Sequence, residues 1–122
     1  MDESLRAAVV LFNNARFVEF QDTLEGVAVP TRAPSERQFY RLLSLLAEGL
    51  HQLSNHELDK AEEALGRFLR KVDGFVPRFR GLNVESLREE VRRTVVEIRE
   101  LRSGRRTEFD PKHLPRLRVL PE

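Results

Sequence analysis

The sequence predicts an all-α protein: a single-domain bundle of about five helices with an irregular, proline-containing C-terminal tail. Its 122 residues suffice for one domain with a hydrophobic core. Apolar residues recur at helical spacing in five stretches, separated by polar, glycine- or proline-containing breaks. Three of the six prolines lie in the last stretch, which can therefore be neither regular helix nor central strand. We expect a helical bundle domain over residues 1–104 and an extended tail over residues 105–122.

Two short helices are expected first. Asp2 or Ser4 can cap the first helix, because both side chains accept hydrogen bonds from backbone amides. Asn14 is expected to cap a second helix over residues 15–25. The buried stripes are expected to be Leu5, Ala8, Val9 and Phe12 in the first helix, and Phe17, Phe20 and Leu24 in the second.

The central helix, over residues 37–53, has the most apolar helical pattern in the chain. Pro30 and Pro34 predict an extended connection before it, and Ser35 with Gln38 predicts a capping box at its start. With about 100° between successive residues, apolar side chains cover more of this helix than one neighbour can bury, so several helices must surround it. The apolar face comprises Phe39, Leu42, Leu43, Leu46, Leu50 and Leu53, widened by Tyr40, Leu45 and Ala47.

The last two helices are expected to start at recognisable caps. Ser54 with Glu57 predicts a capping box for a fourth helix, which runs to about Lys71, antiparallel to the central one. Asn83 is expected to cap a long fifth helix, and Gly104 lies where that helix should stop. The fourth helix should bury Leu58, Ala61, Leu65, Phe68, Leu69 and Val72. The fifth has an almost heptad-like seam of Val84, Leu87, Val91, Val95, Ile98 and Leu101.

The seam of the fifth helix and the apolar residues of the tail both need a surface to pack against. The tail has enough apolar residues to dock on the bundle or on a second subunit. We therefore expect a homodimer or another protein partner. The apolar tail residues are Phe109, Leu114, Leu117, Val119 and Leu120.

The composition favours a cytoplasmic protein. Cysteine is absent, which excludes disulfides, thiolate metal sites and cysteine nucleophiles. The N-terminus begins acidic and lacks the basic start of a signal peptide. No stretch approaches the roughly 18 apolar residues of a membrane span, so no membrane partner is expected.

One flank of the second helix carries polar residues that could perform chemistry. Gln21, Asp22 and Glu25 place an amide and two carboxylates there, and His51 occupies a similar flank of the central helix. If the flanks meet, these side chains could simply hydrogen-bond and fix the packing of two helices. Alternatively, Asp22, Glu25 and His51 offer ligands suited to Zn, Mn or Mg, as in a metal-dependent hydrolase. A carboxylate–histidine pair for acid–base catalysis is the third alternative.

Four stretches of the chain match a known order and spacing. They are Asn14-x-x-Phe17 with Leu24-Glu25, the Leu-Leu-Ala-x-x-Leu-His run that ends at His51, the Ala61-Glu62 region, and residues 82–91. In these stretches, over roughly residues 7–95, the chain resembles the small bacterial, archaeal and plastid proteins of domain-of-unknown-function family 309. The resemblance implies a compact helical bundle and brings no biochemical activity with it.

Several positions depart from the motifs of that family. Gln21 stands where the family usually has histidine, Asp22 where it has glutamate, and Arg41-Leu42 where it tends to have glutamine-glycine. The tryptophan common after the first block is missing, whereas Glu25 and His51 are retained. A metal or acid–base role of the family's histidine does not extend to Gln21, because an amide neither titrates nor binds divalent metals well.

Basic residues crowd the C-terminal part of the chain and could bind nucleic acid. Residues 1–65 carry 6 basic and 11 acidic side chains, whereas residues 66–122 carry 15 and 9. Arginine suits phosphate recognition, but interleaved glutamates can neutralise it, and the one nearby aromatic residue is too few for a base-stacking platform. The candidate residues are Arg99, Arg102, Arg105, Arg106, Arg116 and Arg118.

Taken in order of preference, three functions are expected. The first is a non-enzymatic binding or assembly module of unassigned biochemical role. The second is the hydrolase-like metal site on the second and third helices, and the third is nucleic-acid binding through the arginines. His113, which stands alone between prolines, is expected to be solvated.

Overall fold

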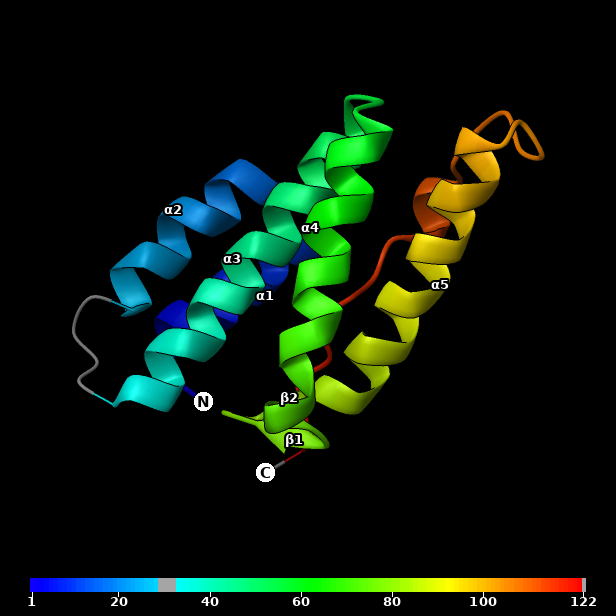
Figure 1. Cartoon of the computed structure of the whole chain (residues 1–122). Coiled ribbons are helices and arrows are strands. Elements are labelled where there is room, and N and C mark those ends of the chain that lie inside the picture. The colour runs from blue at the N-terminus through cyan, green and yellow to red at the C-terminus, as the bar shows by residue number, and fades with distance from the viewer. Residues whose placement is uncertain (29–32, 122) are drawn as a thin grey trace.

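The computed structural model describes residues 1–28 and 33–121. Helices account for most of the described chain, which confirms the predicted all-α bundle (Figure 1). The α-helices are α1 (Glu3–Asn13), α2 (Phe17–Ala28), α3 (Pro34–Ser54), α4 (Leu58–Lys71) and α5 (Val84–Arg102). Two short 3-10 helices, η1 (Val72–Phe75) and η2 (Pro111–His113), and two short strands, β1 (Arg78–Phe79) and β2 (Leu82–Asn83), complete the described elements.

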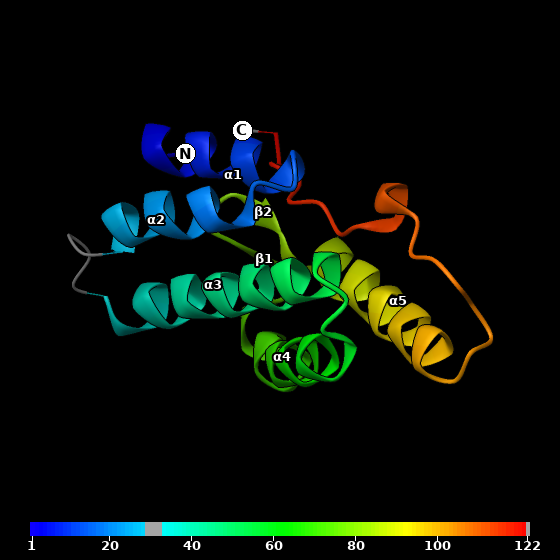
Figure 2. The same ribbon diagram turned by 90° about the horizontal axis from the view of Figure 1, so that it is seen from above.

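The helices are arranged in chain order, each packed on the next. α1 packs on α2, α2 on α3, α3 on α4 and α4 on α5. Seen from above, α3 lies between the α1–α2 pair on one side and α4 on the other (Figure 2). The middle position of α3 explains why its apolar stripe is wider than one neighbour could cover.

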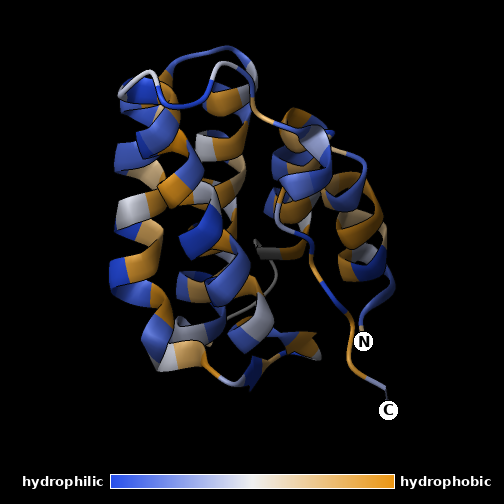
Figure 3. Ribbon diagram, turned by 90° about the vertical axis from the view of Figure 1, so that its right-hand side faces the viewer, coloured by the Kyte–Doolittle hydropathy of each residue, from blue (hydrophilic) through white to orange (hydrophobic). Residues whose placement is uncertain are grey.

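One hydrophobic core runs through the molecule, and α3 contributes most to it. The apolar side of each helix faces inward (Figure 3). Phe39, Leu43, Leu46 and Leu50 of α3 are fully buried. Leu117, from the tail, joins the same core at 2% exposure.

Three predicted helix boundaries are confirmed. Asp2 is the N-cap of α1, since its Oδ1 accepts hydrogen bonds from the amides of Ser4 (2.7 Å) and Leu5 (3.2 Å). Asn83 caps α5, with its Oδ1 accepting from the Ser86 amide at 3.0 Å. Gly104 follows the end of α5 with a φ of +80°, a conformation that favours glycine.

The expected cap of the second helix is wrong. Asn14 is instead the C-cap of α1, and its side chain donates back to the Val10 carbonyl oxygen at 2.8 Å. Helix α2 begins at Phe17, beyond a turn in which Ala15 has a φ of +60°. An asparagine between two helices can serve either end, and here the backward hydrogen bond prevails.

The two expected capping boxes are also absent. Helix α3 begins at Pro34, with Ala33 as an N-cap that makes no side-chain bond, because a proline at the first position needs no amide partner. Ser54 belongs to the end of α3, where its hydroxyl donates to the His51 carbonyl oxygen at 2.6 Å. Glu57 precedes α4 without a side-chain cap bond.

A small β-hairpin between α4 and α5 was not predicted. Strands β1 and β2 are antiparallel, with Phe79 opposite Leu82. The two residues between them, Arg80 and Gly81, both have positive φ, at 50° and 79°, as a tight hairpin turn requires. An Arg-Gly pair is a weaker turn signal than Asn-Gly, and two-residue strands leave no alternating pattern to recognise.

The tail docks on the bundle of its own chain, which confirms one of the two expected alternatives. Val119 forms an antiparallel bridge with Leu82. The Asn83 amide donates to the Arg118 carbonyl oxygen at 2.9 Å, and the Leu120 amide donates to that of Gly81 at 2.8 Å. The tail therefore runs as a short extra strand beside the hairpin.

The seam of α5 is buried within the same chain. Val84, Leu87, Val91 and Ile98 are fully buried, and Val95 is 5% exposed, against the core that α3 and α4 share. The surface on which a homodimer was expected is therefore occupied internally. A homodimer stays a prediction, without that seam as its interface.

In the described part of the chain, no helix is both long and apolar enough to cross a membrane.

Candidate functional site

Gln21 joins α2 to α3. Its Nε2 donates to the Ser44 carbonyl oxygen at 3.0 Å and lies 3.3 Å from the Ser44 hydroxyl. The half-buried side chain is thereby held against the neighbouring helix. Gln21 thus has the packing role that was the first of its expected alternatives.

A hollow of about 550 Å³ lies beside this contact, between α2 and α3. We call it the α2–α3 hollow. Asp22 and Glu25 face it from α2, and Arg37 and Arg41 face it from α3; all four side chains belong to exposed residues. In the described structure, none of these four forms an ion pair. The lining is completed by Gln21, Leu24, Tyr40 and Ser44.

His51 does not join this group. It is exposed on the last turns of α3, with its Nε2 3.3 Å from Asn55 Nδ2. Helices α2 and α3 are antiparallel, so Glu25 lies toward the start of α3, whereas His51 lies seven residues, or about 10 Å, beyond Ser44 in the other direction.

The expected metal ligands are accordingly not assembled. Within the described ranges, no group of three or more histidine, aspartate or glutamate residues is placed to hold a metal ion. Asp22 and Glu25 share the α2–α3 hollow, but the expected third ligand, His51, does not line it. The acid–base pair between this histidine and a carboxylate is likewise not formed.

A second hollow, also of about 550 Å³, lies on the other side of α3. We call it the α3–α4 hollow. Arg37 and Arg41 reach it from α3, and Arg67 and Lys71 reach it from α4. No acidic residue is among the residues that line it, and no described carboxylate forms an ion pair with any of the four. Pro34, Gln38, Leu42 and Leu45 complete the lining.

Sequence reasoning missed this basic hollow, although a signal was present. Arg37 and Arg41, and likewise Arg67 and Lys71, are four residues apart and so lie on one face of their helix. The two helices were expected to be antiparallel neighbours, which brings the start of one beside the end of the other. Combining the spacing with the helix arrangement would have placed the four cations together.

The arginines at the end of α5 are mostly neutralised. Arg102 Nη1 lies 2.8 Å from Glu62 Oε1, and Arg99 Nε lies 3.1 Å from Glu62 Oε2. Hydrogen bonds from Arg102 and then Arg99 lower the pKa of Glu62, because they stabilise its ionised form. These ion pairs join α4 to α5.

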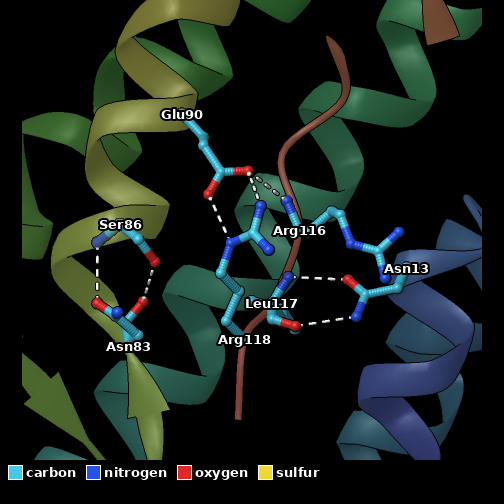
Figure 4. Close-up of polar contacts among 7 residues, drawn as sticks. All are labelled: Asn13, Asn83, Ser86, Glu90, Arg116, Leu117 and Arg118. Carbon is cyan, nitrogen blue, oxygen red and sulfur yellow. Dashed lines mark hydrogen bonds and ion pairs between the residues drawn. The ribbon is translucent and has the colours of Figure 1, made fainter. Parts of the chain in front are cut away.

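Glu90 gathers the tail arginines (Figure 4). Its carboxylate accepts from Arg118 Nε at 3.2 Å and from the backbone amide of Arg116 at 3.2 Å. Arg106 Nη2 lies 3.6 Å from Glu100 Oε2. Of the six arginines expected to bind nucleic acid, only Arg105 and Arg116 have side chains without an ion pair in the described structure.

His113 is not simply solvated, as was expected. Its Nδ1 lies 2.7 Å from Glu97 Oε1, although the side chain is 49% exposed. The short helix η2 brings this histidine back against α5, which the spacing of the prolines alone did not indicate.

Comparison with known protein families, with curated proteins and with solved structures yields no significant match. The resemblance to domain-of-unknown-function family 309 therefore stays a prediction, carried by the residues quoted for it.

Proposed function

We propose that this protein is a binding module and that the α2–α3 hollow holds its ligand. One observation carries the proposal: two carboxylates and two guanidinium groups face the same hollow from opposite helices, and none of the four is engaged in an ion pair. Each is therefore available to a ligand. A small organic molecule with both an amino and an acidic group would satisfy both pairs of charges.

The shape and the walls of the hollow support the same conclusion. A volume of about 550 Å³ suits a small molecule. Leu24 and Tyr40 supply apolar and aromatic surface, while Gln21 and Ser44 supply amide and hydroxyl groups. Small-molecule sites typically combine apolar walls with a few polar groups that fix orientation.

Binding is favoured over catalysis at this position. Asp22 and Glu25 are exposed, whereas a catalytic carboxylate usually works in a site that excludes water. Gln21, which could share in chemistry, is already held by Ser44. The hydrolase-like alternative stays a prediction, and it requires His51 to act from outside the hollow.

The proposal is tested by nuclear magnetic resonance with three probes that differ only in charge: L-phenylalanine, phenethylamine and phenylpropionate. L-phenylalanine should shift the backbone amides of residues 21–25 and 37–44. Each singly charged probe should bind about tenfold more weakly, since one charge-assisted contact is lost. Glu25→Gln should weaken the two amine-bearing probes and leave phenylpropionate unchanged.

Glu108→Gln is the matched control, because it removes one exposed carboxylate outside both hollows. It should leave all three affinities unchanged. The proposal is wrong if none of the probes shifts these amides at millimolar concentration, or if the control weakens binding as much as Glu25→Gln.

Nucleic-acid binding through the C-terminal arginines stays a prediction, and the ion pairs of those residues weigh against it. An arginine held by a glutamate must break that pair before it can contact a phosphate. If binding occurs, its affinity should fall steeply with salt. The test is a titration with a single-stranded RNA at low salt, in which the absence of binding would end the hypothesis.

A further inference from the structure

We propose that the α3–α4 hollow is a site for a small polyphosphate ligand. Four cations meet there, Arg37 and Arg41 from α3 with Arg67 and Lys71 from α4, and no acidic side chain lines the hollow. The site goes beyond the proposed function, since it lies on the opposite side of α3. Arg67 and Lys71 line only this hollow, so the two sites can be tested separately.

The charge distribution distinguishes this cluster from the other basic residues of the protein. Arg99 and Arg102 share Glu62, and Arg118 is held by Glu90. The four cations of the α3–α4 hollow have no such partner in the described chain. Cations four residues apart on one helix repel one another, and bringing two such pairs together adds to the repulsion. A bound anion with several negative charges would relieve it.

The kinds of side chain favour phosphate. The planar guanidinium of arginine donates two parallel hydrogen bonds that match phosphate oxygens, and lysine adds a compact positive charge. Helix α3 begins at Pro34, in the lining of the hollow, so the positive end of its dipole lies on the same side.

The size of the site favours a small ligand over a nucleic acid. The hollow has a volume of about 550 Å³, within the range of small-molecule sites. Nonspecific binding of a nucleic-acid strand uses an extended basic groove with aromatic side chains for stacking. No aromatic residue lines this hollow.

The test is calorimetric titration of the full chain with tripolyphosphate, with sulfate as a simple dianion for comparison. Tripolyphosphate should bind at low ionic strength, at least about tenfold more tightly than sulfate, and more weakly as salt is added. Arg67→Gln and Lys71→Gln should each weaken tripolyphosphate binding about tenfold, because each removes a charge-assisted contact. Neither change should affect L-phenylalanine binding at the α2–α3 hollow.

Arg93→Gln is the control, because it removes the same charge from an exposed position on α5. It should change the affinity less than about twofold. Arg67→Lys tests the geometry: it keeps the charge and loses the fork, so its affinity should fall between those of the natural protein and Arg67→Gln. Since all these residues are exposed, the variants should fold, which circular dichroism verifies.

The proposal is overturned if tripolyphosphate does not bind at low salt, or if Arg93→Gln weakens binding as much as Arg67→Gln. It is also overturned if a single-stranded RNA binds through Arg67 and Lys71 more tightly than tripolyphosphate, because the site would then serve a nucleic acid. If tripolyphosphate binds as expected while L-phenylalanine does not, only the function proposed for the α2–α3 hollow fails.

Discussion

Asn13 links the first helix to the tail through its side-chain amide. Its Nδ2 donates to the Leu117 carbonyl oxygen at 2.9 Å, and its Oδ1 accepts from the Leu117 amide at 2.8 Å (Figure 4). The amide thus pairs with both backbone groups of one residue, as a neighbouring strand would. This contact fixes the position at which Leu117 enters the core.

Asn13→Asp should lower the free energy of unfolding by about 1–2 kcal/mol. A carboxylate still accepts from the Leu117 amide, but it cannot donate to the carbonyl oxygen, which is left without its partner. Urea denaturation measures the loss. Asn14→Asp is the control, since it introduces the same charge at an exposed neighbour, and an equal loss in both variants would contradict the role given to Asn13.

Glu62 should make the stability of the protein depend on pH. Arg102 and Arg99 lower its pKa in the folded protein below the usual value of 4.5. The stabilisation is therefore complete above that value and is lost as the pH falls through the lower, folded-state pKa. Because both arginines are substantially exposed, the ion pairs should contribute no more than about 1 kcal/mol.

The measurement is urea denaturation of Glu62→Gln and the natural protein at about pH 7 and about pH 2. The variant should be less stable at the higher pH, and the difference should shrink at the lower one, where Glu62 is protonated. A difference that is the same at both values would show that the carboxylate charge does not contribute.

Among single residues, caps were predictable when the side chain bonds forward along the chain. Asp2 and Asn83 do so, and both were predicted correctly. Asn14 and Ser54 bond backward to the preceding turn, so the same residue types end helices instead of starting them. Sequence alone does not distinguish the two directions, because they depend on how the following turn runs.

At the scale of elements, helices α3 and α4 approach closely at Gly49. A Cβ atom added there would lie 3.0 Å from both the Ala64 Cβ and the Leu65 Cδ2. Real Cβ atoms seldom come so near to a neighbour, so the two helices would have to move apart. The glycine in the middle of the central helix is thus explained by packing, against its low helix propensity.

Gly49→Ala should destabilise the protein by about 1–2 kcal/mol, since overpacking outweighs the gain in helix propensity. Gly66→Ala, in α4, should instead stabilise it by about 0.5–1 kcal/mol, because its nearest neighbour is the movable end of Arg70. Thermal unfolding of both variants measures the contrast. A stabilised Gly49→Ala variant would show that the helices can separate at no cost.

Element positions were predictable wherever a long apolar period was present. The stripes of α1, α3 and α5 are buried as expected, because a wide face must pack against neighbours. The hairpin of β1 and β2 was not predictable, since four residues in strands leave no period. The seam of α5 shows a further limit: a heptad-like pattern indicates burial, but not whether the partner belongs to the same chain.

At the scale of the whole molecule, the uneven charge of the chain is largely resolved by folding. The first 65 residues have a net charge of −5 and the rest +6. Glu62 pairs with Arg99 and Arg102, and Glu36 lies 3.5 Å from Arg80, so the two halves of the chain neutralise each other. The candidate sites are where this neutralisation fails, and that depends on which helix faces meet, which no charge count can supply.

The tail should contribute directly to the stability of the bundle. It supplies Leu117 to the core, extends the hairpin and ties α1 to α5 through Asn13 and Glu90. Removal of residues 107–122 should therefore cost about 3 kcal/mol or more in the free energy of unfolding, from lost apolar burial and hydrogen bonds. The exposed apolar surface should also make the shortened chain self-associate more than the full chain does.

Urea denaturation and sedimentation equilibrium of both chains test this expectation. Leu117→Ala isolates the core contribution, and it should cost about 2–4 kcal/mol while the backbone contacts of the tail remain. If the shortened chain unfolds at the same urea concentration as the full chain, the tail is not part of the folded unit. If Leu117→Ala costs as much as the whole deletion, the burial of that one leucine accounts for the stabilisation, and the contacts of Asn13 and Glu90 serve only to guide it into place.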